Sequence, residues 1–458
     1  MGIFKAYDIR GLVPSELDAD MGRKIGNAFA RLLKAKRLLV GQDVRTHSPE
    51  IAGAVMDGIR DAGCDVVSIG LSSTPMTYFA IGANDTEGEN VDGGLCVTAS
   101  HNPGEYNGMK LCSRGSKPIS KANGIGEIEE MCAQPYPEVA AERGALIEID
   151  VREAYTAHVE SFMDLGDAVT LAIDAANGMV GHTLPSILPK LSSVTSHSIF
   201  LEPDGTFPNH EANPLKEENL DPVRELVKKI SADLGVSFDG DADRCCFVDE
   251  TGQTVSADLM TALLAREFLK AEPGASVVYD LRSSWVVKEV IAECGGKPVR
   301  DRVGHSFIKA TMRGNGAVFG GELSGHFYFR DNFVCDSGVI AMVRALNLIS
   351  AEKVNGRTFS SLVADLRRYH STGEINFRVE DKAAAIERLE KNYADGRQDH
   401  LDGITVEYGQ LGDDEWWWFN VRQSNTEPLL RLNLEASSAA LRDRRRDELI
   451  GLLGDPEA

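Results

Sequence analysis

The chain has 458 residues, 43% of them hydrophobic, and 48 Lys and Arg against 70 Asp and Glu give a formal net charge of −22. This length is too great for one hydrophobic core and predicts three or four domains. The negative charge argues against nucleic acid and acidic membranes as partners. No stretch is apolar enough to span a bilayer, and residues 1–5 contain no apolar secretory segment, so we expect a cytoplasmic protein. The eight cysteines lack metal-ligand spacing and are expected to be reduced core residues.

A strand, helix, strand unit recurs three times along the chain. In each unit a short apolar strand ends in a charged residue, helical spacing follows, and a second strand ends in a polar loop. The first strands are 38–43, 171–174 and 277–280; the helices begin near Ser48, Pro222 and Ser284; the second strands with their loops are 95–101, 234–244 and 317–326. This alternation predicts α/β domains with mixed, mostly parallel sheets. Ligands gather at the carboxyl ends of such strands, so we expect the three loops to share one cleft.

The pattern changes after about residue 367, where a smaller α+β unit is predicted. A strand at 374–379 and a helix at 381–393 precede two strands that flank residue 422, and a last helix begins near Ser438. The fold prediction is three topologically similar α/β domains and a C-terminal α+β domain around a central cleft. Their predicted boundaries are 1–148, 149–250, 251–367 and 368–458.

The first polar loop, 98–103, has the sequence Thr-Ala-Ser-His-Asn-Pro. It places Ser100 at the mouth of a strand, between small residues that leave the hydroxyl accessible, with an Asn-Pro turn behind it. A nucleophile needs such exposure. A turn serine or a helix N-cap is the alternative interpretation.

The second polar loop, 239–244, has the sequence Asp-Gly-Asp-Ala-Asp-Arg. Three carboxylates at alternate positions can bind one cation, and hard oxygen ligands suit Mg²⁺ or Ca²⁺ rather than Zn²⁺. An EF-hand is excluded because Arg244 stands where that loop requires glycine. A haloacid-dehalogenase motif needs Thr or Val where Asp243 stands. An acidic surface turn stays as an alternative.

A further polar loop, 422–428, follows an expected strand in the last unit. It combines a guanidinium, two hydroxyls and an amide, which together suit a phosphate group. These donors are Arg422, Ser424, Asn425 and Thr426. A polar hairpin is the alternative.

Together the three runs resemble the α-D-phosphohexomutase superfamily, and within it the bacterial phosphomannomutase/phosphoglucomutase enzymes. The resemblance covers nearly the whole chain. It is also carried by residues 6–11, 41–45, 106–110, 304–305 and 320–326.

The resemblance implies a phosphoserine mutase that interconverts hexose 1-phosphate and hexose 6-phosphate. Ser100 would donate its phosphoryl group to the sugar, giving a bound 1,6-bisphosphate that turns and returns a phosphoryl group. The implied metal site consists of Ser100, Asp239, Asp241 and Asp243, and holds one Mg²⁺ per chain. The implied catalytic residues are Ser100, Lys110, Arg244 and His326, with His326 exchanging a proton with the sugar hydroxyl. The implied substrate-binding residues are Tyr7, Arg10, Arg282, His305, Glu322, Ser324, His326, Arg422, Ser424, Asn425 and Thr426.

Further expectations follow from the same resemblance. Glucose or mannose 1,6-bisphosphate would act as activator, small hexose phosphates would be the only partners, and the protein would be a monomer or weak dimer. Leu323 occupies the position that tracks the sugar, and its apolar side chain favours mannose and glucose phosphates. Arg282 departs from the lysine found in many such enzymes, which affects the geometry of that contact.

Three alternatives remain open from the sequence. The first is the same chemistry on glucosamine phosphate. The second, a catalytically silent sugar-phosphate-binding protein, is disfavoured because Ser100 and all three aspartates are present. The third is a metal-dependent phosphatase, which would have no need of a distant second phosphate grip such as the Arg422 loop.

Overall fold

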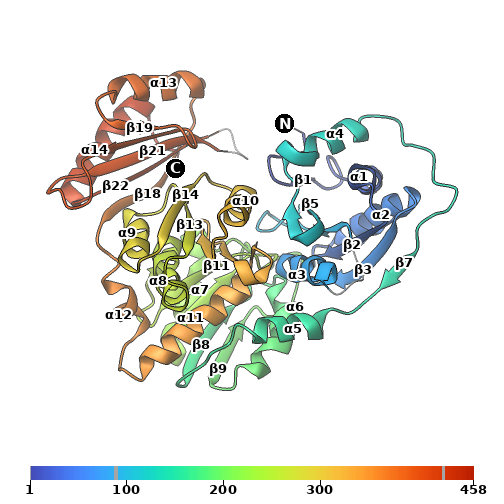
Figure 1. Cartoon of the computed structure of the whole chain (residues 1–458), viewed down its shortest axis with the longest axis horizontal. Helices are drawn as coiled ribbons and strands as arrows, with labels where there is room; N and C mark the ends of the chain where they lie inside the picture. Colours follow the sequence, from blue (N-terminus) through green and yellow to red (C-terminus); the bar gives the residue numbers. More distant parts are fainter. Residues whose placement is uncertain (1, 87–90, 425–428, 458) are drawn as a thin grey trace.

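The computed structural model describes residues 2–86, 91–424 and 429–457, which contain four β-sheets with associated helices (Figure 1). The strand orders are β1-β5-β4-β2-β3-β7 with β6 beside β5, β12-β11-β10-β8-β9, β14-β13-β15-β16-β17, and β18-β22-β21-β20-β19. We refer to the parts built on these sheets as units I to IV. The mixed α/β architecture predicted from the sequence is confirmed.

Unit I combines the longest sheet with helices that bear the expected apolar stripes. Its elements are β1 (Ile9–Leu12), α1 (Ala19–Leu33), β2 (Arg37–Gln42), α2 (Ser48–Asp61), β3 (Asp65–Leu71), α3 (Thr74–Thr86), β4 (Gly93–Val97), β5 (Tyr106–Ser113), β6 (Lys117–Pro118), α4 (Gly126–Cys132) and β7 (Leu146–Glu148). Helix α2 begins at Ser48, as predicted, with Pro49 in its first turn, where a missing N–H leaves no hydrogen bond unmade. Ile51, Val55 and Ile59 on its inner face are buried in the unit's core.

Units II and III repeat one topology, and this agrees with the repeat seen in the sequence. Unit II contains α5 (Arg152–Glu160), β8 (Val169–Asp174), α6 (Val180–Ile187), β9 (Val194–Ile199), α7 (Asp221–Ile230), β10 (Leu234–Phe238), β11 (Cys245–Asp249) and β12 (Thr254–Val255). Unit III contains α8 (Ala257–Ala271), β13 (Ser276–Asp280), α9 (Trp285–Glu293), β14 (Lys297–Asp301), α10 (His305–Asn315), β15 (Phe319–Gly321), β16 (Phe327–Phe329), β17 (Cys335–Asp336), α11 (Gly338–Lys353) and α12 (Phe359–Ala364).

Unit IV is a smaller antiparallel sheet with two helices, and Figure 1 shows it above unit III. Its elements are β18 (His370–Phe377), α13 (Lys382–Asn392), β19 (Arg397–Asp399), β20 (Ile404–Tyr408), β21 (Trp417–Gln423), β22 (Leu430–Ala436) and α14 (Ala439–Leu453). The predicted α+β arrangement is confirmed. Strand β18 begins before the expected residue 374.

The three predicted loops occupy one topological position. In each α/β sheet a central strand runs parallel to one neighbour and antiparallel to the strand that follows it in the chain. The strand pairs are β4 and β5, β10 and β11, and β15 and β16. The connections between them are residues 98–105, 239–244 and 322–326. Each loop therefore leaves the carboxyl end of a parallel strand, where such sheets bind ligands.

Units II and III share one hydrophobic core, which reaches into unit I. Helix α11 follows the last strand of sheet III but also bonds to unit II, since Asn347 accepts from the Asp164 backbone amide at 2.9 Å and Ser350 accepts from that of Gly166 at 3.0 Å. This common core keeps the functional loops in fixed mutual positions. Among the described residues, no helix has the length and apolar character that crossing a membrane requires.

Candidate active site

Ser100 lies on the loop after β4 with a backbone φ of 53°, in the left-handed region that costs most residues about 1 kcal/mol. Its hydroxyl donates to Asp239 Oδ2 at 2.8 Å, and its amide donates to Thr98 Oγ1 at 3.0 Å. The expected accessible hydroxyl is wrong for this conformation: Ser100 is fully buried. The reason is that the loop of unit II covers it and supplies its hydrogen-bond acceptor.

Arg45 fixes the backbone of the serine loop by hydrogen bonds. Its fully buried guanidinium donates to the backbone carbonyls of Ser100 at 2.9 Å and Asn102 at 2.6 Å, and to two more carbonyls farther along the loop. The aspartate loop of unit II packs directly against the serine loop. A Cβ on Gly240 would stand only 2.4 Å from the Ser100 carbonyl oxygen. The glycine of the Asp-Gly-Asp run is therefore required by the contact between the two loops.

Three buried aspartates follow β10 and lie together, as predicted. One carboxylate oxygen from each of Asp239, Asp241 and Asp243 lies within 4.8 Å of the other two. Lys110, on β5, donates to Asp241 Oδ2 at 2.6 Å and also to Asp243. Thr74 donates to the same Asp241 oxygen at 2.6 Å. Units I and II thus meet at this carboxylate cluster.

The cluster fits a cation. Burial, followed by the charges of Asp243 and Asp241, raises the pKa of Asp239 well above its usual value. Burial opposes ionisation of Asp243 as well, but the cations Lys110 and Arg244 hold its pKa well below the usual value. The buried Oδ1 atoms of Asp241 and Asp243 accept no hydrogen bond from any residue that the structure describes. Unsatisfied buried oxygens beside converging carboxylates are the ligands that hard divalent cations require.

The loop after β15 brings Glu322, Ser324 and His326 to the same place. The Arg244 Nε lies 3.2 Å from His326 Nε2 and donates to it, so the neutral ring carries its proton on Nδ1, 2.8 Å from the Ser324 hydroxyl. Glu322 is 1% exposed, accepts from the Gly304 amide at 2.9 Å and binds the Tyr328 hydroxyl. These contacts fix the imidazole beside the unit II loop.

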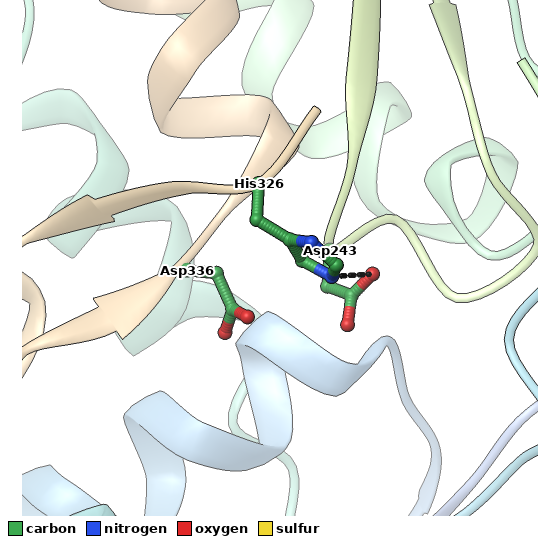
Figure 2. Close-up of side chains that lie close together, drawn as sticks. All are labelled: Asp243, His326 and Asp336. Carbon is green, nitrogen blue, oxygen red and sulfur yellow. Dashed lines mark ion pairs between the residues drawn. The ribbon is translucent and has the colours of Figure 1, made fainter. Parts of the chain in front are cut away.

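Asp336 is a neighbour of this histidine that the sequence interpretation missed. Figure 2 shows Asp243, His326 and Asp336 together, and one ligand atom of each lies within 4.8 Å of the others. Asp336 forms a fully buried ion pair with Lys309 at 2.9 Å, and the Lys309 ammonium lies 3.9 Å from the centre of the Tyr78 ring. Because Tyr78 belongs to unit I, its contact with Lys309 connects units III and I close to His326.

The remaining residues expected around the sugar lie at the edges of this cluster. His305 begins α10, and its ring centre is 6.4 Å from that of His326 and 5.8 Å from that of Tyr7. Burial, with nearby Lys309 and Lys110, lowers the pKa of His305 well below its usual value. Arg10 pairs with Asp8 and binds Asn102 of the serine loop.

Two of the expected phosphate-binding residues, Arg422 and Arg282, contact one carboxylate that the sequence did not single out, Glu374 on β18, and Arg431 joins them. Arg422 donates to it at 3.2 Å, Arg282 at 3.5 Å and Arg431 at 2.6 Å. Arg282 also forms an ion pair with Asp280 at 2.8 Å.

The loop itself is described only in part. Ser424 is half-buried and follows β21, with its backbone amide donating to the Leu429 carbonyl at 2.9 Å. Asn425 and Thr426, predicted to complete this loop, lie outside the described residues.

Two centres therefore emerge, joined by unit III. One holds a serine hydroxyl, a carboxylate triad, Lys110, Arg244 and His326. The other holds paired arginines. Asp280 links them, because it binds Arg282 and accepts from the Leu323 amide at 2.7 Å. The first can support phosphoryl transfer with a metal ion, and the second can bind an anion.

Comparison with known proteins gives matches along the whole chain. The matching family models are phosphoglucomutase/phosphomannomutase alpha/beta/alpha domain I at residues 1–136, domain II at 153–252, domain III at 256–369 and the C-terminal domain at 374–452. A phosphomannomutase of Salmonella montevideo is 39% identical over 98% of both chains. A protein described as phosphohexose mutases from Xanthomonas campestris is 40% identical over 98% of both chains.

Solved structures agree with the fold. A phosphoglucomutase/phosphomannomutase family protein from Burkholderia thailandensis has a TM-score of 0.89 at 33% identity, covering 98% of this chain and 96% of that chain. Parafusin, a phosphoglucomutase from Paramecium, has a TM-score of 0.77 at 16% identity over 99% of both chains, which supports the fold alone.

Proposed function

The chain belongs to the phosphoglucomutase/phosphomannomutase family and is a phosphohexose mutase, an isomerase, and on that premise we propose how its residues perform the reaction. The observation that carries the proposal is the 2.8 Å contact between the Ser100 hydroxyl and Asp239, at the edge of the carboxylate triad. A serine with only a structural role in a turn would have no need of the buried cluster formed by Asp239, Asp241 and Asp243.

Ser100 is the phosphoryl carrier. In its phosphorylated form the bond from Oγ to phosphorus breaks while a free sugar hydroxyl forms the new bond to phosphorus. The sugar becomes a 1,6-bisphosphate and the serine recovers its hydroxyl. After the bisphosphate turns, Ser100 Oγ takes the phosphoryl group from the other position, which leaves the isomeric hexose phosphate and restores phosphoserine.

Asp239, Asp241 and Asp243 would hold Mg²⁺, since they offer hard oxygen ligands and two unsatisfied buried oxygens. The bound ion would neutralise charge on the transferring phosphoryl group. Lys110 contacts two of these carboxylates, and it would keep the cluster compact and contribute positive charge beside the transferred group. Arg244 lies on the sugar side of the same cluster.

His326 would move the proton of the reacting sugar hydroxyl. Its Nε2 faces Arg244 and Asp243, while Ser324 holds the opposite nitrogen. A neutral imidazole held in one tautomer is suited to accept a proton and return it in the reverse half-reaction. Glu322 and Ser324 would accept hydrogen bonds from sugar hydroxyls, with His305 and Tyr7 closing the site.

The phosphate that is not reacting would bind to unit IV. Arg422 and Arg282 already share one carboxylate oxygen of Glu374, so an incoming phosphate dianion would replace part of that carboxylate's role. Ser424 with Asn425 and Thr426 would complete this grip, and Arg10 would assist. Glucose or mannose 1,6-bisphosphate would serve as the activator that phosphorylates an unmodified serine.

The experiment that tests the mechanism is intact-mass measurement before and after incubation with glucose 1,6-bisphosphate, with the modified residue located by peptide mapping. We expect one added phosphoryl group, on Ser100. A panel of mannose, glucose and glucosamine 6-phosphates then tests the sugar preference that apolar Leu323 favours. Phosphorylation at another residue contradicts the carrier role, and turnover of glucosamine phosphate alone contradicts the sugar preference.

A further inference from the structure

A cavity of about 230 Å³ lies between units III and IV, apart from the two centres described above. Its walls come from the end of β13, from α9 and β14, and from the unit IV strands β19, β20 and β21. Ser283 lines it, while the preceding residue, Arg282, bonds to Asp280 and Glu374 in the anion-binding centre. Cavity and substrate centre thus share one segment of chain.

Positive side chains dominate the polar lining of the cavity. Arg300 and Arg397 both pair with Glu407, the one carboxylate among the lining residues, and Arg300 also pairs with Asp399 of β19. Lys288 lies with its ammonium 3.4 Å from the centre of the Trp285 ring, and within the described residues it forms no ion pair. Burial lowers the pKa of Lys288 to about 8. Glu407 and Glu435 offset this effect only in part, and neither pairs with Lys288 within the described residues, so this partly buried cation is left for an external anion.

Ser283 gives a second, independent indication of a ligand. Its side chain is buried, lies in the wall of the cavity, and its hydroxyl oxygen forms no hydrogen bond within the described residues. Buried hydroxyl groups in folded proteins nearly always have a partner, so an unpaired one facing a cavity indicates that the partner comes from the cavity. The hydroxyl is a donor that suits a phosphate oxygen.

We propose that this cavity binds a phosphate group, either inorganic phosphate or a small phosphomonoester, between Lys288, Ser283 and Arg300. The volume is below the range of about 300–1,000 Å³ typical of drug-sized ligands, so a small ligand is required. Guanidinium and ammonium donors recognise phosphate strongly. In a chain with a net charge of −22, cations gathered in one cavity make a local exception that favours an anion.

A phosphate bound in the cavity would act on the joint between units III and IV. Lys288, Ser283 and Arg300 belong to unit III, and Arg397 belongs to unit IV, so a bound phosphate adds contacts across the joint. This consequence rests on the proposed mutase reaction and on the further condition that unit IV moves while the bisphosphate turns, whereas binding itself does not. Phosphate in the cavity therefore lowers kcat without raising the KM for hexose phosphate.

The test uses the native tryptophans as reporters, because three of the four, Trp285, Trp416 and Trp418, lie at this joint. Tryptophan fluorescence of the full-length protein is titrated with inorganic phosphate while saturating glucose 1,6-bisphosphate and Mg²⁺ fill the catalytic centre. We expect a saturable change whose Kd rises at least tenfold in Lys288→Met and severalfold in Ser283→Ala. Lys391→Met, on exposed α13, is the matched control and should behave as wild type.

Three outcomes overturn the proposal: a response abolished by the bisphosphate, an unchanged Kd in both variants, or equal binding of acetate. Methyl phosphate titrated in parallel identifies the ligand, since tighter binding than inorganic phosphate indicates an ester. Far-UV circular dichroism and basal kcat confirm that each variant is folded. Phosphate at its Kd should lower kcat at constant KM in wild type but not in Lys288→Met. An unchanged wild-type kcat would overturn the effect on the joint between units III and IV, and it would leave the assignment as a mutase untouched.

Discussion

Ser100 combines burial, a strained backbone and a hydrogen bond to a carboxylate at one position. We expect Ser100→Ala to lower hexose-phosphate isomerisation at least about 10³-fold, because the substitution removes the proposed phosphoryl carrier. Its free energy of unfolding should fall by only about 1 kcal/mol, the cost of one hydrogen bond lost from Asp239. A coupled turnover assay and urea unfolding measure the two effects.

Ser350 provides the control for this substitution. It is equally buried and forms two hydrogen bonds on α11, remote from the carboxylate triad. Ser350→Ala should show a similar loss of stability with normal turnover. Near-normal isomerisation by Ser100→Ala, with phosphate found on another residue, would refute the assignment.

Asp241 is the central member of the triad, and it accepts from both Lys110 and Thr74. Asp241→Asn keeps the shape but removes a charge from the cation site, so kcat should fall about 100-fold or more while KM changes little, because the ion acts mainly in the transition state. Steady-state kinetics across a Mg²⁺ titration should also show a raised metal requirement.

Asp249→Asn is the matched change for this prediction, since Asp249 is buried on β11 but only caps a turn. It should cost stability without altering the metal requirement. Full activity of wild-type protein after chelation would remove the triad from the mechanism.

At the scale of elements, a histidine pins the long connection between β9 and α7 to the end of β8. His210 Nε2 lies 2.9 Å from Asp174 and Nδ1 lies 2.8 Å from the Glu211 carbonyl, so both partners accept and the ring is an imidazolium. Burial opposes this charge, but Asp174 raises the pKa of His210 above its usual value. The stabilisation is therefore complete below an unfolded-state pKa of about 6.5 and is lost as pH rises through the folded-state pKa.

His210→Gln should consequently lower the free energy of unfolding by about 1 kcal/mol more at about pH 5.5 than at about pH 9. Urea unfolding of wild type and variant at the two pH values measures this difference. His197→Gln, on β9 and exposed, is the control and should show no such pH dependence. An equal loss at both pH values would mean that His210 contributes packing rather than charge.

The elements and the loops between them were largely predictable from the sequence. Apolar runs of strand length that end in charged residues predicted β2, β4, β8, β10, β13 and β15, because alternation with helical spacing leaves few other folds. Convergence of the Ser100 and Asp239 loops followed from the rule that ligand loops lie at the carboxyl ends of parallel strands. Helix boundaries agreed within a residue or two where a proline or serine marked the start, as at α2 and α7.

Long-range contacts of charged residues were not predictable. Glu374 and Asp336 lie in unremarkable local sequence, and Arg45 lies in a run that carries the resemblance without an assigned role. Each is defined by partners far along the chain: three arginines, Lys309 and the serine-loop carbonyls. Burial of a charge depends on which surfaces meet, and periodicity carries no information on that. The burial of Ser100 was missed for the same reason, since the loop that covers it belongs to another unit.

At the scale of the whole molecule, the chain concentrates positive charge where substrate must bind despite its net charge of −22. In the proposed mechanism, Lys110 and Arg244 face the transferring phosphoryl group, and Arg282 and Arg422 face the opposite one. The two pairs come from different units. A mutase must present both ends of one sugar to a single serine, so the distant grip has to accept either orientation and then release.

That requirement gives the last prediction. Arg422→Met keeps the buried volume beside Glu374 but removes the charge that would bind the distant phosphate. Phosphorylation of Ser100 by saturating bisphosphate should persist and fall much less than isomerisation, because it needs one phosphoryl transfer and no turning of the bound sugar. Isomerisation should fall about 100-fold or more, since positioning of bound groups alone can supply about 7 kcal/mol of barrier lowering.

Removing the chain from about Tyr369 onward should have the same effect in stronger form, with slow phosphorylation of Ser100 as the internal sign that the remaining units are folded. Free bisphosphate, measured by quenched-flow chromatography, should accumulate more per turnover in Arg422→Met, because an intermediate without its second anchor escapes before it turns. Isomerisation by the truncated protein at close to the full-length rate would contradict this. The Arg422 loop would then be a polar hairpin, and reorientation would occur within units I to III alone.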